Sequence, residues 1–331
     1  MNEPGIEAKV AFLRRPEAYP SPPRAVDAVE THMSWVFLAG RDVYKLKKPV
    51  RWDSLDFSTP ALRKRDCEEE VRLNRRLARD VYLGTIELTF DLEAGLALAG
   101  AGEPVDWLVH MRRLPADRML DALILRGPLS EADVRPTALH LARFYADARP
   151  LALAAPAYRS RLARGVRDDL RELGRPEFGL CRSRVHELAE AQLRFLAEKP
   201  ALFDQRVHEG RIIEGHGDLR PEHICLTPEP AIIDCLEFSA ELRMLDPADE
   251  LAFLLLECER LGSARVGRWF LDAYREVSGD EPPEPLLRFH RTYRALRRAT
   301  IAAWHLQDPA VADRERWRER ARCYLDLAGA A

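Results

Sequence analysis

The sequence is as informative in what it lacks as in what it contains. It has no basic excess, since 51 Lys and Arg stand against 54 Asp and Glu, which argues against a general nucleic-acid binder. No apolar run approaches the ~18 residues that a membrane span needs, and the polar N-terminus is unlike a signal peptide. The six cysteines form no Cys-x-x-Cys pair, which predicts reduced, mostly buried thiols in a cytoplasmic protein.

Lysine is scarce in this chain. Only six of its 51 basic residues are lysines, and the other 45 are arginines. Three of the six lie within four residues, at Lys45, Lys47 and Lys48. An ammonium is a compact charge, whereas a guanidinium is a planar fork. A lysine cluster in an arginine-rich chain therefore indicates a site that requires an ammonium, with chance clustering on a solvated strand as the alternative.

The order of elements predicts two lobes. The runs 34–38 and 43–47 flank a Gly-containing turn and predict a β-hairpin. A helix is predicted from Pro60 to about Arg79, after the cap signal Thr59-Pro60. Further strands are predicted at 84–90 and 107–111, helices at 138–148, 184–197, 249–260 and 286–306, and a short strand pair at 224–226 and 231–234. We therefore expect an α+β fold with a small β-rich lobe, residues 1–113, and a larger helical lobe, residues 114–331.

Reactive side chains are densest in one octapeptide, His216-Gly-Asp-Leu-Arg-Pro-Glu-His223. A second carboxylate, Asp234, follows Asp218 by sixteen residues and ends the predicted short strand pair. This segment resembles the catalytic loop of protein kinases and, with Gly after His, that of the aminoglycoside phosphotransferases and related small-molecule kinases. The resemblance spans about residues 31–252, and Tyr-Lys-Leu-Lys-Lys-Pro-Val at 44–50 resembles the hallmark of an uncharacterised bacterial branch.

The resemblance implies a bilobal protein-kinase-like fold and a role for each matching residue. Asp218 would accept the proton of the acceptor hydroxyl as general base. Arg220 would neutralise charge on the migrating phosphoryl group. Asp234 would bind Mg²⁺ against the β- and γ-phosphates, because Mg²⁺ prefers oxygen ligands. His216 is interpreted as a structural residue of the loop.

The ammonium that contacts the nucleotide phosphates is assigned first to Lys45 and second to Lys47. The two side chains share one face of a strand, so the sequence leaves both open. Their partner carboxylate is predicted to be Glu70, which has the best spacing among the three consecutive glutamates of the following helix. The alternative is that these glutamates only stabilise the N-terminal half of that helix.

Two departures from the kinase pattern weaken the match. His223 stands where these kinases carry a metal-binding Asn, and it could bind Mn²⁺, hydrogen-bond a phosphate, or mark a lost second metal site. Glu237 is the candidate replacement carboxylate, with an ordinary loop acid as its alternative. No G-x-G-x-x-G loop occurs, so Thr31 and Ser34 are the candidate phosphate cradle.

The predicted function is transfer of the γ-phosphoryl group of ATP, or GTP, to a hydroxyl of a small molecule, with Mg²⁺ or Mn²⁺. One alternative is a catalytically degenerate, nucleotide-binding regulatory protein. The other is a metal-dependent hydrolase that uses the same His and Asp residues. A P-loop ATPase is unsupported, since no G-x-x-x-x-G-K-[ST] occurs.

The acceptor is not identified by the sequence. From residue 261 onward 13 arginines stand against 10 acids, which disfavours a polycationic aminoglycoside. Arg291, Arg294 and Arg298 fall near one helix face, interpreted first as solvated and second as lining the cleft for an anionic or sugar-like acceptor. No nucleic-acid or membrane partner is expected, and the oligomeric state is left open.

Overall fold

The computed structural model describes residues 4–52, 55–308, 311 and 313–329. The chain forms two compact units: unit 1 is Met1–Met119 with His223–Ala240, and unit 2 is Leu120–Glu222 with Glu241–Ala331. The predicted lobe division after residue 113 stays a prediction. Segment 223–240, which lies within the second predicted lobe, packs with the residues of unit 1.

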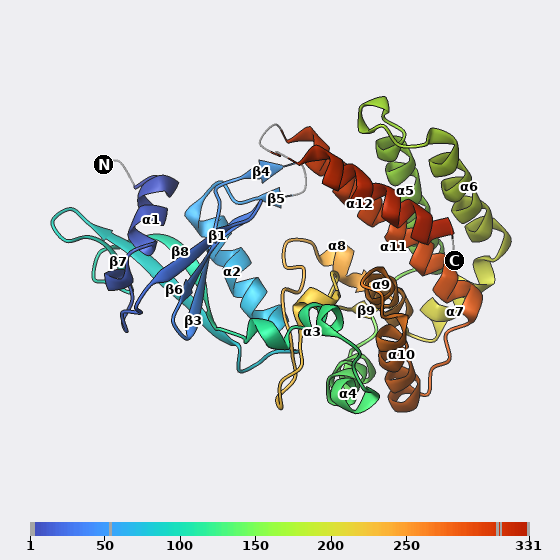
Figure 1. The fold of residues 1–331 in the computed structure, drawn as a ribbon, viewed down its shortest axis with the longest axis horizontal. Helices are drawn as coiled ribbons and strands as arrows, with labels where there is room; N and C mark the ends of the chain where they lie inside the picture. Colours follow the sequence, from blue (N-terminus) through green and yellow to red (C-terminus); the bar gives the residue numbers. More distant parts are fainter. Residues whose placement is uncertain (1–3, 53–54, 309–310, 312, 330–331) are drawn as a thin grey trace. The chain divides into compact units, whose positions relative to one another are not determined.

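Unit 1 is built on a six-stranded antiparallel sheet of order β1-β2-β3-β8-β6-β7 (Figure 1). The predicted hairpin is confirmed, with β2 pairing β3 around Gly40, whose φ of +66° suits glycine. The strands of unit 1 are β1 (Val26–Glu30), β2 (Ser34–Ala39), β3 (Asp42–Lys47), β4 (Arg51–Trp52), β5 (Leu55–Asp56), β6 (Tyr82–Asp91), β7 (Gly95–Leu98), β8 (Glu103–Arg112), β10 (Ile224–Cys225) and β11 (Ala231–Ile232).

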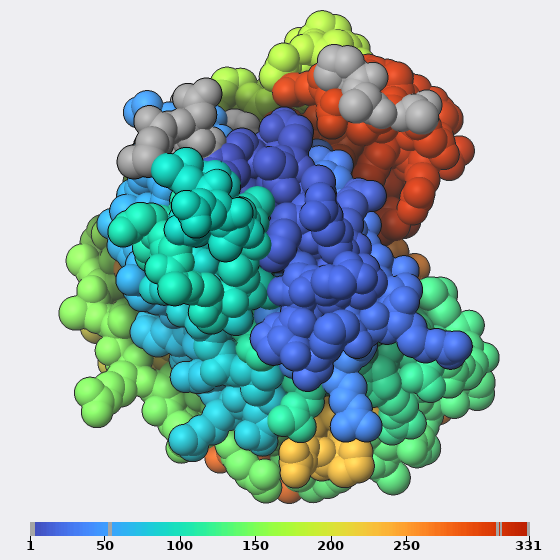
Figure 2. Space-filling model, turned by 90° about the vertical axis from the view of Figure 1, so that its left-hand side faces the viewer, coloured from blue at the N-terminus to red at the C-terminus, as the bar shows by residue number. Residues whose placement is uncertain are grey.

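One helix packs on each face of this sheet. Helix α1 (Ile6–Leu13) packs on the face that carries Tyr44 and Leu46. Helix α2 (Pro60–Asn74) packs on the opposite face, which carries Val43, together with the β10–β11 hairpin. Figure 2 shows the blue N-terminal residues beside the teal β6–β7 region, with which they share a core. The alternation along β3 therefore directs Lys45 and Lys47 toward α2.

Unit 2 is mainly helical, and its core joins α5, α6, α9, α11 and α12. Its elements are α3 (Leu120–Arg126), α4 (Glu131–Asp147), α5 (Ala155–Leu173), α6 (Arg182–Glu198), α7 (Pro200–His208), β9 (Ile213–Glu214), α8 (Ala240–Arg243, whose first residue belongs to unit 1), β12 (Met244–Leu245), α9 (Pro247–Arg260), α10 (Ala264–Ser278), α11 (Glu284–Trp304) and α12 (Arg314–Gly329). Among the described helices, none has the length and apolar character that a membrane crossing requires.

Capping residues fix where the two site-bearing helices begin. Thr59 accepts a hydrogen bond from the Leu62 N–H, and Pro60 occupies the first position of α2. Asp246 accepts from the Ala248 N–H, and Pro247 opens α9. The predicted start of α2 is therefore confirmed.

Candidate active site

In unit 1, strand β3 and helix α2 bring two lysines to one carboxylate. Glu70, which is 1% exposed, accepts a hydrogen bond from each lysine. Its Oε1 lies 2.9 Å from Lys45 Nζ, and its Oε2 lies 2.6 Å from Lys47 Nζ. Glu70, the partner carboxylate predicted from sequence, thus pairs with both candidate lysines.

Lys47 is sealed in the interior and is fully buried. Its Nζ lies 2.6 Å from Asp66 Oδ2 and also pairs with Glu237. Burial by itself lowers the pKa of Lys47, but Glu237 and Glu70 outweigh it and raise that pKa well above the ordinary value. Burial also raises the pKa of Asp66 to about 6, against the pull of Lys47. Lys47 is therefore a permanent charge surrounded by three carboxylates.

Lys45 has a more open environment. Its side chain is 15% exposed, and its Nζ lies 3.2 Å from Asp234 Oδ1, on a side chain that is 48% exposed. Burial lowers the pKa of Lys45, whereas Asp234 and Glu70 raise it well above its ordinary value. An ammonium beside a half-exposed carboxylate has the chemistry to meet a phosphate and its counter-cation.

Asp234 is held in an unusual backbone conformation. Its φ of +61° lies in the left-handed region, which few non-glycine residues occupy, although aspartate does so more readily than most. The Asp234 N–H donates to the Tyr82 hydroxyl at 3.1 Å, and the next N–H, of Cys235, donates to Asn74 Oδ1 at 2.9 Å. Asn74 in turn donates to the Glu70 carbonyl at 2.9 Å. The chain after β11 is therefore tied to α2 and β6 on both sides of the Asp234 side chain.

The other two predicted metal ligands are engaged differently. His223 is buried, and its Nε2 lies 3.5 Å from Asp234 Oδ2. Glu237 pairs with Lys47, and although burial raises the pKa of Glu237, Lys47 and Lys45 lower it below its ordinary value. Within the described ranges, no three His, Cys, Asp or Glu side chains are placed to hold a metal by themselves. Metal binding by Asp234, His223 and Glu237 stays a prediction.

The predicted phosphate cradle is the tight turn between β1 and β2. Thr31 Oγ1 lies 2.9 Å from both the N–H and the carbonyl of Ser34, and the Thr31 N–H donates to the same carbonyl at 2.8 Å. Ser34 is opposite Lys47 in the β2–β3 register. The turn thus ends next to Lys47, the last residue of β3, and its role toward phosphate stays a prediction.

In unit 2, the predicted catalytic pair is formed by neighbours in the chain. Arg220 Nε donates to Asp218 Oδ2 at 3.0 Å, and Arg220 also donates to Glu222 Oε1 at 2.5 Å. Asp218 is 24% exposed and Arg220 18% exposed. Asp218 thus presents a partly accessible carboxylate next to a guanidinium, as a proton acceptor beside a charge-neutralising group requires.

The backbone of this loop is held by one buried acid. Glu250 on α9 accepts from the His216 N–H at 3.0 Å and the Gly217 N–H at 2.5 Å, and the Tyr145 hydroxyl donates to it at 2.9 Å. Burial raises the pKa of Glu250, and these donors oppose the rise. His216 is itself fully buried, and its Nδ1 accepts from the Asp218 N–H at 3.3 Å. The interpretation of His216 as a structural residue fits these contacts.

The expected solvated arginine face on α11 is wrong. Arg291, Arg294 and Arg298 are only 13–18% exposed, and each pairs with a carboxylate of α9. Arg294 donates hydrogen bonds of 2.7 and 2.9 Å to the two carboxylate oxygens of Asp249. It also donates to the Gly217 carbonyl at 3.3 Å. Their charge is already balanced, so they give no support to an anionic acceptor.

Three residues of the lysine cluster were not found by sequence reasoning: Asp66, Asn74 and Tyr82. A signal for two of them exists, because Asp66, Glu70 and Asn74 recur at four-residue spacing and so share one face of α2. Tyr82 carries no such signal. Its hydroxyl accepts a hydrogen bond from the Asp234 N–H, which is 152 positions away in the sequence.

No family model matches the chain. Uncharacterised proteins of Mycobacterium tuberculosis (strain H37Rv) and Mycobacterium bovis are each 38% identical to it over 279 residues. The match covers 83% of this chain and 54% of each relative, so the chain spans about half the length of the curated relatives it matches.

Solved structures show the fold. An aminoglycoside 2'-phosphotransferase-IIIa in complex with GDP superposes with a TM-score of 0.57 at 16% identity over 93% of both chains. A choline/ethanolamine kinase family protein from Mesorhizobium loti superposes with a TM-score of 0.54 at 16% identity, over 98% of this chain and 99% of the other. A choline kinase from Cryptosporidium parvum gives 0.56 at 9% identity, over 97% and 95%. The chain therefore has the bilobal, kinase-like fold of these small-molecule phosphotransferases, and the fold predicted from sequence is confirmed.

Proposed function

We propose that the protein transfers the γ-phosphoryl group of ATP to a hydroxyl of a small molecule. The observation that carries the proposal is the placement of Lys45 Nζ, 2.9 Å from Glu70 and 3.2 Å from the half-exposed Asp234. This arrangement supplies an ammonium for nucleotide phosphates and a carboxylate for their metal, on a fold shared with small-molecule kinases.

The exposure of the two lysines supports different roles for them. Lys45 is the phosphate ligand, because its ammonium is partly accessible and borders Asp234. Lys47 is a positioning residue, because it is fully buried and its three carboxylate partners tie β3 to α2 and to the segment after Asp234. Thr31 and Ser34 remain the candidate phosphate cradle, although the N–H groups of both residues and the Thr31 hydroxyl would have to give up their bonds within the turn to reach a phosphate.

Asp218 acts as the base in this proposal. The acceptor oxygen attacks the γ-phosphorus, the bond from that phosphorus to the β–γ bridging oxygen breaks, and ADP leaves. The hydroxyl proton passes to the Asp218 carboxylate. Arg220, 3.0 Å from Asp218, orients that carboxylate and offsets negative charge. The products are ADP and a phosphate monoester.

The donor set fits Mg²⁺ bound together with a nucleotide. Mg²⁺ is usually held by one or two carboxylates plus substrate phosphates rather than by an all-protein cage. Asp234 offers accessible oxygens, and the cluster holds four carboxylates against two ammonium groups. When bound, Mg²⁺ would neutralise phosphate charge there, with His223 and Glu237 as further candidate ligands. Mn²⁺ and GTP are the alternative metal and nucleotide.

The first experiment is thermal melting of the full chain with ATP or GTP, each alone and with Mg²⁺ or Mn²⁺. A nucleotide at ~100 times its dissociation constant adds roughly 2.7 kcal/mol, which raises Tm by several degrees. Asp234→Asn should lose the metal-dependent part of this shift, whereas Asp27→Asn, on the exposed side of edge strand β1, should keep it. Equal shifts in both variants would reject the assignment of Asp234.

A second candidate function is a nucleotide-binding regulatory protein without turnover. It is favoured by His223, whose ring lies 3.5 Å from Asp234 at the position where related kinases have an amide. This function predicts a Tm shift with nucleotide that is indifferent to metal, and no labelled product from [γ-³²P]ATP with any alcohol. A metal-dependent hydrolase instead predicts stabilisation by Zn²⁺ or Mn²⁺ without nucleotide.

The acceptor is to be found by screening. A panel of sugars, amino sugars, choline and aminoglycosides with [γ-³²P]ATP tests the expectation that aminoglycosides are not substrates. We expect the protein to act in the cytoplasm, where ATP is available, without a nucleic-acid or membrane partner. Its oligomeric state follows from light scattering of the same samples.

A further inference from the structure

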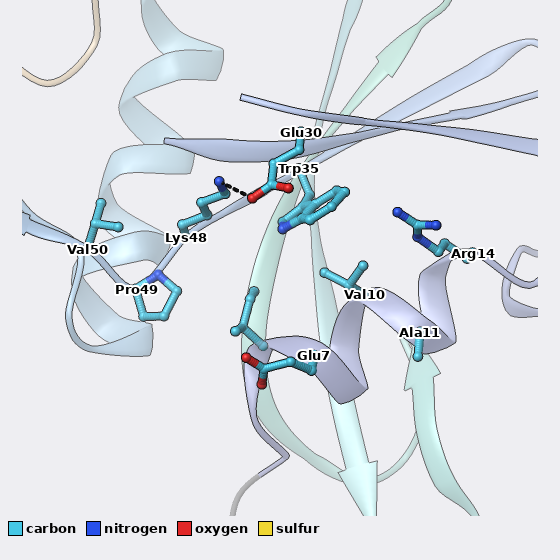
Figure 3. Close-up of a pocket in the computed structure, with 10 residues that line it drawn as sticks. Glu7, Val10, Ala11, Arg14, Glu30, Trp35, Lys48, Pro49 and Val50 are labelled. Carbon is cyan, nitrogen blue, oxygen red and sulfur yellow. Dashed lines mark hydrogen bonds and ion pairs between the residues drawn. The ribbon is translucent and has the colours of Figure 1, made fainter. Parts of the chain in front are cut away.

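A pocket lies in unit 1, across the sheet from the lysine cluster. Trp35 is opposite Leu46 in the β2–β3 register, so both lie on the α1 face, whereas Lys45 and Lys47 lie on the α2 face. Helix α1, strand β2 and the segment after β3 enclose about 530 Å³ there (Figure 3). This volume is within the range of small-molecule sites.

The pocket has an apolar wall with a cation beside it. Figure 3 shows the Trp35 ring facing Val10 of α1, with Pro49 at the far side of the pocket. The Arg14 guanidinium lies 5.3 Å from the centroid of the Trp35 ring. An arginine on an indole face is attracted to it by a cation–π interaction while its N–H groups stay available to an anion.

The four charged groups of the pocket are not equivalent. Lys48 donates to Glu30 at 2.5 Å, so this pair is internally neutral. Among the residues that the structure describes, Arg14 has no carboxylate partner. Glu7 lies seven residues earlier on α1, about 10 Å along the helix axis, and it repels a second anionic group at that end. The Lys48 ammonium also lies 5.8 Å from the centroid of the Trp35 ring, but its charge is shared with Glu30. Arg14 is therefore the cation of the pocket that is left to meet an anion.

We propose that this pocket binds a small molecule with an aromatic or alicyclic body and a single carboxylate, sulfonate or phosphate group. The body packs on Trp35 and Val10, and the anion meets the Arg14 guanidinium. Both the contacts and the face of the sheet are separate from those of the proposed phosphotransfer site. The proposal consequently stands or falls independently of that function.

The test uses two fluorescent probes with the full chain: 8-anilinonaphthalene-1-sulfonate and N-phenyl-1-naphthylamine, the same aromatic skeleton without the sulfonate. Arg14→Gln should weaken the sulfonate probe about tenfold, the loss of one charge-assisted contact, and leave the neutral probe within twofold. Arg15→Gln, the adjacent exposed arginine that does not line the pocket, is the matched control and should change neither.

The location is tested by a variant that fills the pocket. Ala11 is exposed and lines the pocket, so Ala11→Trp should weaken both probes at least tenfold while Tm and far-UV circular dichroism stay unchanged. Saturating ATP with Mg²⁺ should displace neither probe. The proposal is overturned if Arg14→Gln and Arg15→Gln behave alike, if Ala11→Trp still binds the probes, or if nucleotide displaces them.

Discussion

The lysine cluster around Glu70 in unit 1 and the arginine cluster around Asp246 in unit 2 are both buried, but they use different cations. In unit 2 the buried cations are arginines, and Arg206, for example, bonds both oxygens of Asp246 and both oxygens of Asp280 at 2.6–2.8 Å. In the cluster around Glu70 in unit 1 the cations are lysines, and Lys47 meets three carboxylates that approach from α2 and from the segment after Asp234.

The difference follows from the shape of the two cations. A guanidinium is a planar fork that matches carboxylates lying in its plane. An ammonium has three N–H donors around one nitrogen, so it can donate to carboxylates that approach from several directions. The unit 2 clusters brace helices and a loop, whereas the lysine cluster has a carboxylate surplus and an open end at Asp234. The compact ammonium of Lys47 therefore suits three carboxylates that approach it from different elements.

The largest expected effect is on the rate of phosphoryl transfer, and it distinguishes the Asp218 loop of unit 2 from the lysine cluster of unit 1. Asp218→Asn should lower phosphoryl transfer by about 10²–10⁴-fold, because the hydroxyl proton loses its acceptor. The nucleotide-induced shift in Tm should be unchanged, since Lys45 and Asp234 are untouched. Glu222→Gln, which alters the other carboxylate that contacts Arg220, is the control. Loss of nucleotide binding in Asp218→Asn would contradict the assignment of separate roles.

The next effect is on the free energy of unfolding, and it distinguishes Lys47 from Lys45. Lys47→Met leaves Glu70 and Glu237 buried without that cation, and this should cost about 3–5 kcal/mol of unfolding free energy. Lys45→Met should cost about 1 kcal/mol or less, because Glu70 keeps Lys47 and Asp234 is half exposed. Chemical denaturation measures both. Equal losses would refute the distinction, whereas loss of the nucleotide shift in Lys45→Met would sharpen it.

Sequence reasoning found the elements whose pattern is local. The β2–β3 hairpin, the start of α2 and the helices α9 and α11 were predicted within a few residues, because turns, caps and periodicity lie in neighbouring residues. Strand β1 was not identified. It is an edge strand with Asp27 and Glu30 among its five residues, so it lacks the apolar alternation of a half-buried strand.

The candidate site divides in the same way. Kinase-like spacing singled out Lys45, Lys47 and Glu70, which the structure brings into contact. The sequence left the two lysines equivalent, because only tertiary packing seals one and leaves the other at the edge of the cluster. The arginines of α11 were misassigned for a related reason: their carboxylate partners are on α9, 32–45 positions earlier for Arg291 and Arg294.

The third prediction concerns how the stability of the fold depends on pH through one buried aspartate in each unit. Burial raises the pKa of Asp66 in unit 1 and of Asp169 in unit 2 to about 6. A carboxyl whose pKa is higher in the folded state stabilises the fold fully below its unfolded pKa, near 4, and loses this contribution as pH rises through 6.

Relative to Asp66→Asn, the wild type should therefore lose up to about 3 kcal/mol of unfolding free energy between pH 4 and pH 7. Asp169→Asn should give the same direction. Denaturant titrations at several pH values measure this. A constant difference between wild type and Asp66→Asn would show that Lys47 keeps Asp66 ionised throughout.

The smallest effect concerns Glu250, which holds the backbone of the loop that carries Asp218. Glu250 presents one oxygen to each of two N–H donors, of His216 and Gly217. In Glu250→Gln an amide NH₂ must face one of these donors, which should cost about 1–3 kcal/mol, while Glu259→Gln, on the same helix but partly exposed, should cost under about 1 kcal/mol. Phosphoryl transfer should fall together with stability in Glu250→Gln, because the loop carries Asp218. Destabilisation with unchanged turnover would mean that Arg294, through the Gly217 carbonyl, holds the loop without Glu250.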